Sequence, residues 1–179
     1  MEKIDAFHIG PPKSARTWVY MCLQEHPSVV VPKRDLVHYY DIFYAKGEEW
    51  YSQFFSRESS DQIIIDTTPS YIYSPWAPRR IAKDNPGAKI ICSLRNPINR
   101  AFSHYWHEKK KKKIRFEFSE VLENYDLFSS WVEPAFYARH IERYLEHFSR
   151  RQILCIPFRL LKNNDEEFLR RILEFIDVD

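Results

Sequence analysis

The sequence of 179 residues is poor in glycine, in net charge and in long apolar segments. With only three glycines, Gly10 stands out because it directly follows an apolar run. A formal net charge of +2 is too small to indicate nucleic-acid binding. No apolar run approaches the length of a membrane span, and 44% hydrophobic and 16% aromatic residues exclude a disordered chain. What remains is a folded protein large enough for a sizeable core.

Cysteine is also scarce. Cys22, Cys92 and Cys155 are widely spaced, lie among apolar neighbours and form no CxxC pair. An odd count of this kind predicts reduced core cysteines rather than a disulfide framework. The charged start of the sequence, EKID after the first Met, does not fit a signal peptide. We therefore expect a cytoplasmic location.

Short runs rich in Ile and Val alternate with helical stretches along the chain. This alternation indicates a parallel sheet covered by helices on both faces. The predicted fold class is α/β, a three-layer α/β/α arrangement with a central, mostly parallel sheet. Without repeats, linkers or an internal boundary, we expect a single domain over residues 1–179. Strands are predicted at 5–9, 28–31, 62–66, 89–94 and 152–157, and helices at 16–25, 47–55, 76–83, 100–112, 118–124, 136–148 and 166–176.

Residues 9–18, IGPPKSARTW, join the first predicted strand to the first predicted helix. The first turn of a helix exposes unpaired N–H groups and the positive end of the helix dipole, which favour an anion. Lys13, Ser14, Arg16 and Thr17 lie at this junction and predict a phosphate-binding loop. A polar helix cap beside a surface lysine is the structural alternative. The P-loop nucleotidase motif does not fit, because it needs a glycine immediately before the lysine.

A second candidate phosphate site begins at the end of the fourth predicted strand, where the chain reads RNPINRAFSHY. Pro97 ends strand pairing, and Asn99 is a suitable N-cap for the next helix. Arg95 then lies at the strand end, and Ser103 reaches the same anion from the fourth helical residue. The arginine fork can donate two hydrogen bonds to a phosphate, although a capped helix with a surface arginine is the structural alternative. Two anion sites at the carboxyl edge of a sheet suit a nucleotide with 5′ and 3′ phosphates.

Together these segments resemble the sulfotransferases that use 3′-phosphoadenosine 5′-phosphosulfate (PAPS) as donor. The family's 5′-phosphosulfate loop is typically PKSGTTW; residues 12–14 and 17–18 match it, while Ala15 replaces the glycine and Arg16 the first threonine. The family pattern R-N/D-P-x-x-R-A-x-S holds the donor's 3′-phosphate through its first arginine and its serine, here Arg95 and Ser103. The resemblance extends, with gaps, from about residue 6 to 161. It is closer to the Golgi glycan and bacterial sulfotransferases than to any kinase.

The resemblance implies a P-loop-nucleotidase-like sulfotransferase fold and a reaction in which a sulfuryl group moves from PAPS to a hydroxyl or amine. The acceptor would be a glycan, a lipid or a small molecule, and no metal is needed. Lys13 would neutralise charge on the leaving oxygen, and Trp18 would stack on the adenine, although a core tryptophan is an equal alternative. The implied donor-binding residues are Lys13, Ser14, Ala15, Arg16, Thr17, Trp18, Arg95 and Ser103.

The acceptor side is less well defined. Residues 66–71, DTTPSY, resemble the family's D-x-S/T-P-x-Y turn, so Thr68, Pro69 and Tyr71 are implied acceptor-binding residues. Many family members carry K-E-x-H-F-F after the second strand, and the glutamate removes the acceptor proton in the glycan enzymes. If Asp35 takes the place of that glutamate, one extra residue separates it from His38. Asp35 and His38 are both candidate bases, and we favour Asp35 because its position matches the acidic residue of the glycan enzymes.

Two departures keep an alternative function open. Alanine tolerates positive φ less well than glycine, which affects the loop at Ala15. Family members also usually continue beyond the position of Asp179 into a segment that closes over the donor. A truncated chain and a catalytically impaired nucleotide- or sulfate-binding homologue are therefore alternatives to an active enzyme. The lysine run at 109–113 is expected to be a solvated loop, with a clamp for an acidic acceptor as the other interpretation.

Overall fold

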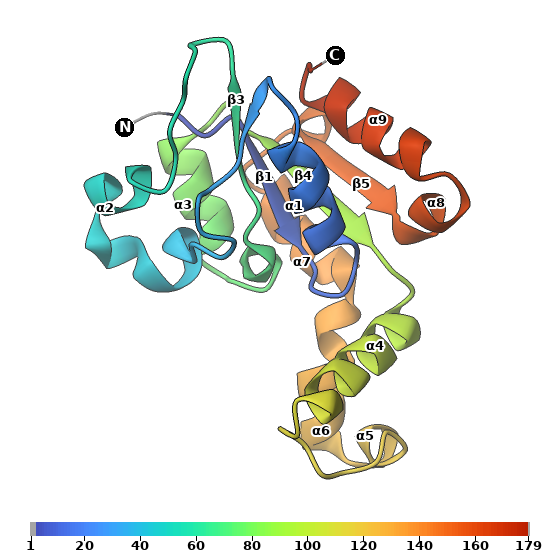
Figure 1. Cartoon of the computed structure of the whole chain (residues 1–179). Helices are drawn as coiled ribbons and strands as arrows, with labels where there is room; N and C mark the ends of the chain where they lie inside the picture. The colour runs from blue at the N-terminus through green and yellow to red at the C-terminus, as the bar shows by residue number, and fades with distance from the viewer. Residues whose placement is uncertain (1–2, 179) are drawn as a thin grey trace.

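The computed structural model describes residues 3–178 and contains a five-stranded sheet in the order β2-β3-β1-β4-β5. Every pairing between neighbouring strands is parallel. The carboxyl ends of the strands therefore meet at one edge, which faces the lower part of the molecule in Figure 1. The strands are β1 (Ala6–Gly10), β2 (Val29–Val30), β3 (Ile63–Asp66), β4 (Lys89–Leu94) and β5 (Ile153–Pro157).

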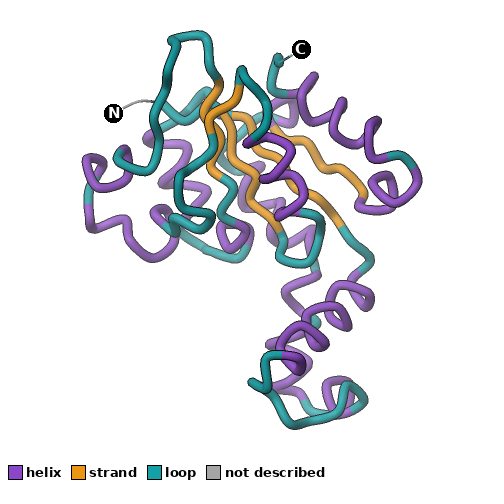
Figure 2. Tube along the Cα trace, in the orientation of Figure 1, coloured by secondary structure: helices purple, strands orange, loops and turns teal. Residues whose placement is uncertain are grey.

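Helices cover both faces of the sheet, as the alternating sequence predicts (Figures 1 and 2). Successive strand residues point to opposite faces, so Ile64 and Ile90 pack in one apolar cluster, and Ile65 and Ile91 in the other. The first cluster includes residues of α2, α3 and α7, and the second includes residues of α1 and α9. The helices are α1 (Arg16–Gln24), α2 (Glu48–Ser52), α3 (Ala77–Asp84), α4 (Pro97–Lys110), α5 (Glu120–Glu123), α6 (Tyr125–Trp131), α7 (Tyr137–Leu145), α8 (Phe158–Asn163) and α9 (Asp165–Phe175).

The predicted three-layer α/β fold is confirmed, and two helices were not expected. These are α6, whose first turn is capped by the Asn124 side chain, and α8, which follows β5 directly. The predicted N-cap Asn99 is wrong: α4 begins at Pro97 rather than at residue 100, and Asn96 caps it by accepting from the Asn99 backbone N–H at 3.1 Å. A proline is favoured as the first helical residue because that position needs no N–H donor.

Helices α4, α5 and α6 form an arm that extends beyond the carboxyl edge of the sheet (Figure 1). The arm has a small apolar cluster of its own, built on Ala101, Val121 and Val132. Buried Arg100 donates to the backbone carbonyl of Trp131, which fixes α4 against the end of α6. The arm therefore carries one wall of the space beyond the strand ends.

The cysteines differ from the predicted core positions. Cys92 is buried in β4, but Cys22 is only partly buried and Cys155 is exposed on β5, an edge strand. The side chains of an edge strand are covered less completely than those of a central strand. No helix within residues 3–178 is long and apolar enough to cross a membrane.

Candidate functional site

A cavity of about 820 Å³ opens at the carboxyl edge of the sheet. Its walls come from the loop between β1 and α1, the loop after β2, the turn after β3, helix α4 and the segment from α8 to α9. The cavity therefore lies where an open parallel sheet binds ligands. Its lining residues include Lys13, Ala15, Arg16, Thr17, Trp18, Leu36, His38, Pro69, Ser70, Arg95, Ser103, His104, His107, Glu108, Phe158, Leu161 and Asp165.

The loop after β1 depends on left-handed backbone. Gly10 has φ 105°, and a Cβ there would lie 2.3 Å from the Pro69 carbonyl oxygen, so glycine allows the loop to contact the turn after β3. Lys13 and Ala15 also have positive φ, at 70° and 74°. Ala15 is the N-cap of α1 and offers no side-chain cap. The alanine thus holds the conformation that glycine adopts more readily.

Positive charge is concentrated on the side of the cavity formed by the loop after β1 and by Arg95, which we call the donor side because the sequence predicts PAPS binding there. Arg95 donates to the Lys13 carbonyl at 2.9 Å, and its guanidinium lies 4.8 Å from the centre of the Phe158 ring. Burial, with Arg95 and Lys111 close by, lowers the pKa of Lys13 below its ordinary value. Lys13 and Arg95 lie at the loop that leads into α1, where the helix dipole and free N–H groups add to the field. The arrangement suits a multiply charged anion.

The remaining predicted donor residues divide between the cavity wall and the core. Thr17 and Ser103 line the cavity, with Ser103 in the second turn of α4 rather than at its fourth residue. Trp18 lines the cavity and also packs edge-on against Phe168, with ring centres 6.0 Å apart. Ser14 is fully buried and outside the lining, and its hydroxyl has no partner among residues 3–178. A hydroxyl in that condition is available to hydrogen-bond a ligand or a buried water.

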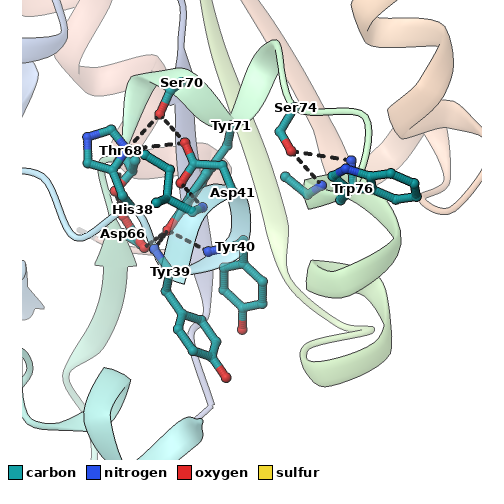
Figure 3. A network of polar contacts seen from close by, with 12 residues as sticks. His38, Tyr39, Tyr40, Asp41, Asp66, Thr68, Ser70, Tyr71, Ser74 and Trp76 are labelled. Carbon is teal, nitrogen blue, oxygen red and sulfur yellow. Dashed lines mark hydrogen bonds and ion pairs between the residues drawn. The ribbon is translucent and has the colours of Figure 1, made fainter. Parts of the chain in front are cut away.

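On the acceptor side, His38 belongs to a polar network with Asp41 and Ser70 (Figure 3). Its Nδ1 lies 3.1 Å from Asp41 Oδ2 and 3.0 Å from Ser70 Oγ, and Ser70 also donates to Asp41. Burial raises the pKa of Asp41, but hydrogen bonds from His38 and Ser70 outweigh it and leave the pKa below its ordinary value. A carboxylate on Nδ1 fixes the orientation of the imidazole and leaves Nε2 for a ligand.

Asp35 does not have the surroundings of an acceptor base. It lies outside the cavity lining, and both of its carboxylate oxygens accept from Arg16, one of them at 3.1 Å. Leu36 lines the cavity instead. Counted back from His38 without an insertion, the glutamate of the K-E-x-H-F-F pattern falls on Leu36. The geometry therefore favours His38 over Asp35, contrary to our expectation from the sequence.

Two of the three predicted acceptor residues lie in the core rather than on the cavity wall. Thr68 and Tyr71 are fully buried outside the cavity lining and donate to opposite oxygens of Asp66, at 2.7 and 2.9 Å (Figure 3). Tyr51 donates to the same carboxylate at 2.7 Å. Burial raises the pKa of Asp66 despite these hydrogen bonds. Pro69 does line the cavity, and Ser70, which we did not predict, lies beside it.

Helix α4 contributes residues that were not predicted. His104, directly after Ser103, and His107 and Glu108, one turn further on, line the cavity. Ser103 and His107, and His104 and Glu108, are each four residues apart and so are neighbours along the helix surface, a signal the sequence already contained. Burial and the charge of Arg100 lower the pKa of His104 to about 4, which keeps it neutral near pH 7. In the described part of the chain, no group of three or more His, Cys, Asp or Glu side chains could hold a metal ion.

Comparisons with known proteins agree with this geometry. The family described as "Sulfotransferase domain" matches residues 3–179. This chain is 32% identical, over 95% of its length, to mouse (Mus musculus) bifunctional heparan sulfate N-deacetylase/N-sulfotransferase 4. Over 96%, it is 30% identical to mouse heparan sulfate glucosamine 3-O-sulfotransferase 3B1.

Solved structures show the same fold. A sulfotransferase from Alicyclobacillus acidocaldarius superposes with a TM-score of 0.85 at 22% identity, covering 100% of this chain and 83% of the other. A mouse sulfotransferase complexed with PAP (adenosine 3′,5′-bisphosphate) superposes with a TM-score of 0.65 at 20% identity, covering 100% of this chain and 60% of the other. The chain spans only 22% and 45% of the length of the two heparan sulfate relatives. With the family pattern matched along nearly its whole length, the chain belongs to the sulfotransferase family.

Proposed function

We propose that this chain transfers a sulfuryl group from PAPS to a hydroxyl or amine of a carbohydrate acceptor. The observation that carries the proposal is that one cavity brings together Lys13, Arg95 and the oriented imidazole of His38. Phosphate-binding cations and a competent base are the two groups that such a transfer needs.

The donor side fits PAPS and its product adenosine 3′,5′-bisphosphate (PAP). Lys13 and the first turn of α1 would hold the 5′-phosphate, and Arg95 with Ser103 the 3′-phosphate. The positive surroundings of Lys13 support an anionic ligand at this loop, as does the buried Ser14 hydroxyl, which has no hydrogen-bond partner in the described part of the chain. Bound PAPS would supply an activated sulfuryl group. Trp18 contributes an aromatic face to the same wall.

In the proposed reaction, the bond from sulfur to the 5′-phosphate oxygen breaks and a bond from sulfur to the acceptor oxygen or nitrogen forms. His38 accepts the acceptor proton on Nε2 while Asp41 stabilises the resulting imidazolium. Lys13 balances the negative charge that appears on the 5′-phosphate oxygen of PAP. The products are the sulfated acceptor and PAP, and the proton leaves from His38.

An acidic glycan is the proposed acceptor. The relatives named above carry heparan sulfate in their names, and a run of lysines at 109–113 follows the cavity-lining part of α4. Lys111 is close enough to Lys13 to influence its pKa. Lys109 and Lys113 pair with Glu117 and Glu108, whereas residues 110–112 form no ion pair within the described part of the chain. These lysines could attract sulfates or carboxylates along a chain of sugars.

A nucleotide-binding homologue without transfer activity is the second candidate. It is favoured by Leu36 at the position of the family's glutamate and by the strained Ala15 in the loop. Both candidates require the same donor site, so only chemistry separates them.

The test is transfer of radiolabelled sulfate from PAPS to an acceptor library that includes desulfated heparan sulfate. Calorimetric titration with PAP and AMP accompanies it. We expect PAP to bind much more tightly than AMP and at least one glycan to become labelled. Tight PAP binding without labelling of any acceptor favours the binding homologue, and equal affinity for PAP and AMP contradicts the paired phosphate sites.

A further inference from the structure

Arg16 is the residue by which this loop departs most from the family pattern in charge, and the structure gives it a partner. Arg16 is the first residue of α1 and lines the cavity. Both of its terminal nitrogens donate to Asp35, which lies in the loop between β2 and His38. The pair is bidentate, a geometry that orients a guanidinium as well as neutralising it.

The location of Arg16 explains why it needs a carboxylate. A cation at the first turn of a helix faces the positive end of the dipole, and Lys13 and Arg95 lie on the same cavity wall. The Arg16 side chain is 12% exposed, so little water screens it, whereas the Asp35 side chain is 46% exposed. Asp35 therefore compensates a largely buried charge from a position nearer to solvent.

The pair also joins the two sides of the cavity. Asp35 precedes His38 by three residues, and Tyr20 of α1 donates to the Pro32 carbonyl in the same loop at 3.2 Å. These contacts thus tie Arg16 and the start of α1 to the loop that leads to His38, and Arg16 and His38 line the same cavity. A sulfuryl group in transit must lie between that loop and the base. Three N–H groups of Arg16 are engaged, by the two Asp35 oxygens and by Thr17 Oγ1 at 3.2 Å, and the others remain for a ligand.

We propose that Asp35 is a positioning residue of the donor site, holding Arg16 so that its remaining N–H groups meet the sulfuryl end of PAPS. This inference rests on the proposed function and gives Asp35 a role distinct from that of an acceptor base. The proposal makes the effect of Asp35 conditional on Arg16. Asp35→Asn would release Arg16 in the present chain, but would change little where threonine, the family residue, occupies position 16.

The test is a double-mutant cycle of Asp35→Asn and Arg16→Thr, with Asp35→Glu as the conservative variant and Glu25→Gln, an exposed change at the end of α1, as control. Single-turnover transfer is measured with PAPS and the best acceptor from the library. We expect Asp35→Asn to lower the transfer rate about tenfold without weakening PAP binding, and Asp35→Glu to recover most of the rate. In the Arg16→Thr background, Asp35→Asn should change the rate less than about twofold, and the rise of rate with pH should persist in every variant.

Three results would overturn the proposal. Asp35 is the base if Asp35→Asn abolishes transfer, and its pH-dependent rise, whatever residue 16 is. It is merely structural if both nucleotides bind more weakly in step with a loss of stability. It competes with PAPS for Arg16 if Asp35→Asn raises the rate. A wild-type chain that transfers nothing would contradict the proposed function, yet the cycle can still be completed on the ratio of PAPS to PAP affinity, where coupling between the two positions supports the inference and additivity contradicts it.

Discussion

The two sides of the cavity differ in how their charges are compensated. On the acceptor side His38 is held by Asp41, and where the two sides meet Arg16 is paired with Asp35, so both residues have a carboxylate partner. On the donor side Lys13 and Arg95 lie together, and neither forms an ion pair within residues 3–178. The donor side therefore keeps a positive field that a bound anion relieves. The acceptor side is preorganised by internal pairs and needs no ligand to hold its shape.

This difference predicts opposite responses to mutation. Removing a donor-side cation weakens the attraction for an anion and relieves repulsion between the remaining cations, so the fold should tolerate it. Removing one member of an acceptor-side pair leaves its partner uncompensated, so orientation and chemistry are affected together.

His38→Ala, which changes the acceptor side, is expected to have the largest effect. Loss of a general base is expected to reduce the transfer rate by about 10²- to 10⁴-fold. Single-turnover transfer should also lose the rise with pH that a general base produces, while PAP affinity stays unchanged. His147→Ala, on an exposed residue near the end of α7, is the matched control. Full activity in His38→Ala together with an inactive Asp35→Asn would restore Asp35 as the base.

Lys13→Ala should have the next largest effect. Removing a group that stabilises charge appearing on the leaving oxygen is expected to cost roughly 10²- to 10³-fold in transfer rate. Affinity for PAP should fall much less than the rate, because the lysine matters most as the oxygen becomes anionic. Lys46→Ala, an exposed lysine outside the cavity, controls for the loss of one charge. A mutant that transfers at the wild-type rate would show that Lys13 has no role in transfer and only belongs to the loop before α1.

Arg95→Ala tests nucleotide binding on the donor side independently of the transfer reaction. Loss of a charge-assisted phosphate contact is expected to cost about 1.5–3 kcal/mol, so PAP should lose most of its advantage over AMP. Calorimetric titration of both nucleotides measures this directly, and AMP affinity serves as an internal reference. Arg159→Ala, on the exposed neighbour of Phe158, should leave the preference intact. If Arg95→Ala still prefers PAP over AMP as the wild type does, the 3′-phosphate binds elsewhere.

The sequence predicted the donor side better than the acceptor side, for a physical reason. The strands were recognised from their short runs rich in Ile and Val; Arg95 directly follows β4, and Lys13 lies three residues after the end of β1. The path of each short segment then fixes where its side chains lie. Residue identity alone did not show that a 3-10 turn at Pro69–Ile72 directs Tyr71 into the core and Ser70 towards the cavity.

Asp35 shows a second limit of prediction from sequence. Its acidic character matched a family position, but its partner Arg16 is 19 residues away, and only the folded chain brings the two together. By contrast, His38 and Asp41 are only three residues apart, but their contact depends on a short helical turn at Tyr39–Phe43 that begins after a left-handed His38 and that the sequence did not predict. The cytoplasmic location and the single domain over residues 1–179 stay predictions.

The smallest predicted effect concerns the backbone of the donor loop. Ala15 is held at φ 74°, a conformation that costs a residue with a Cβ about 1–2 kcal/mol more than it costs glycine. Ala15→Gly also gives the unfolded chain more freedom, which offsets about 0.4–1 kcal/mol of the gain. Urea unfolding should therefore show a net stabilisation of up to roughly 1 kcal/mol.

Ala138→Gly is the matched control, because that alanine is exposed within α7, where glycine costs about 1 kcal/mol. Opposite signs for the two variants would show that position 15 is strained in the folded protein. A destabilisation of similar size in both would mean that the loop gains nothing from glycine. PAP affinity in Ala15→Gly adds a functional readout: if the strained backbone already has the shape that the phosphate requires, affinity will not change.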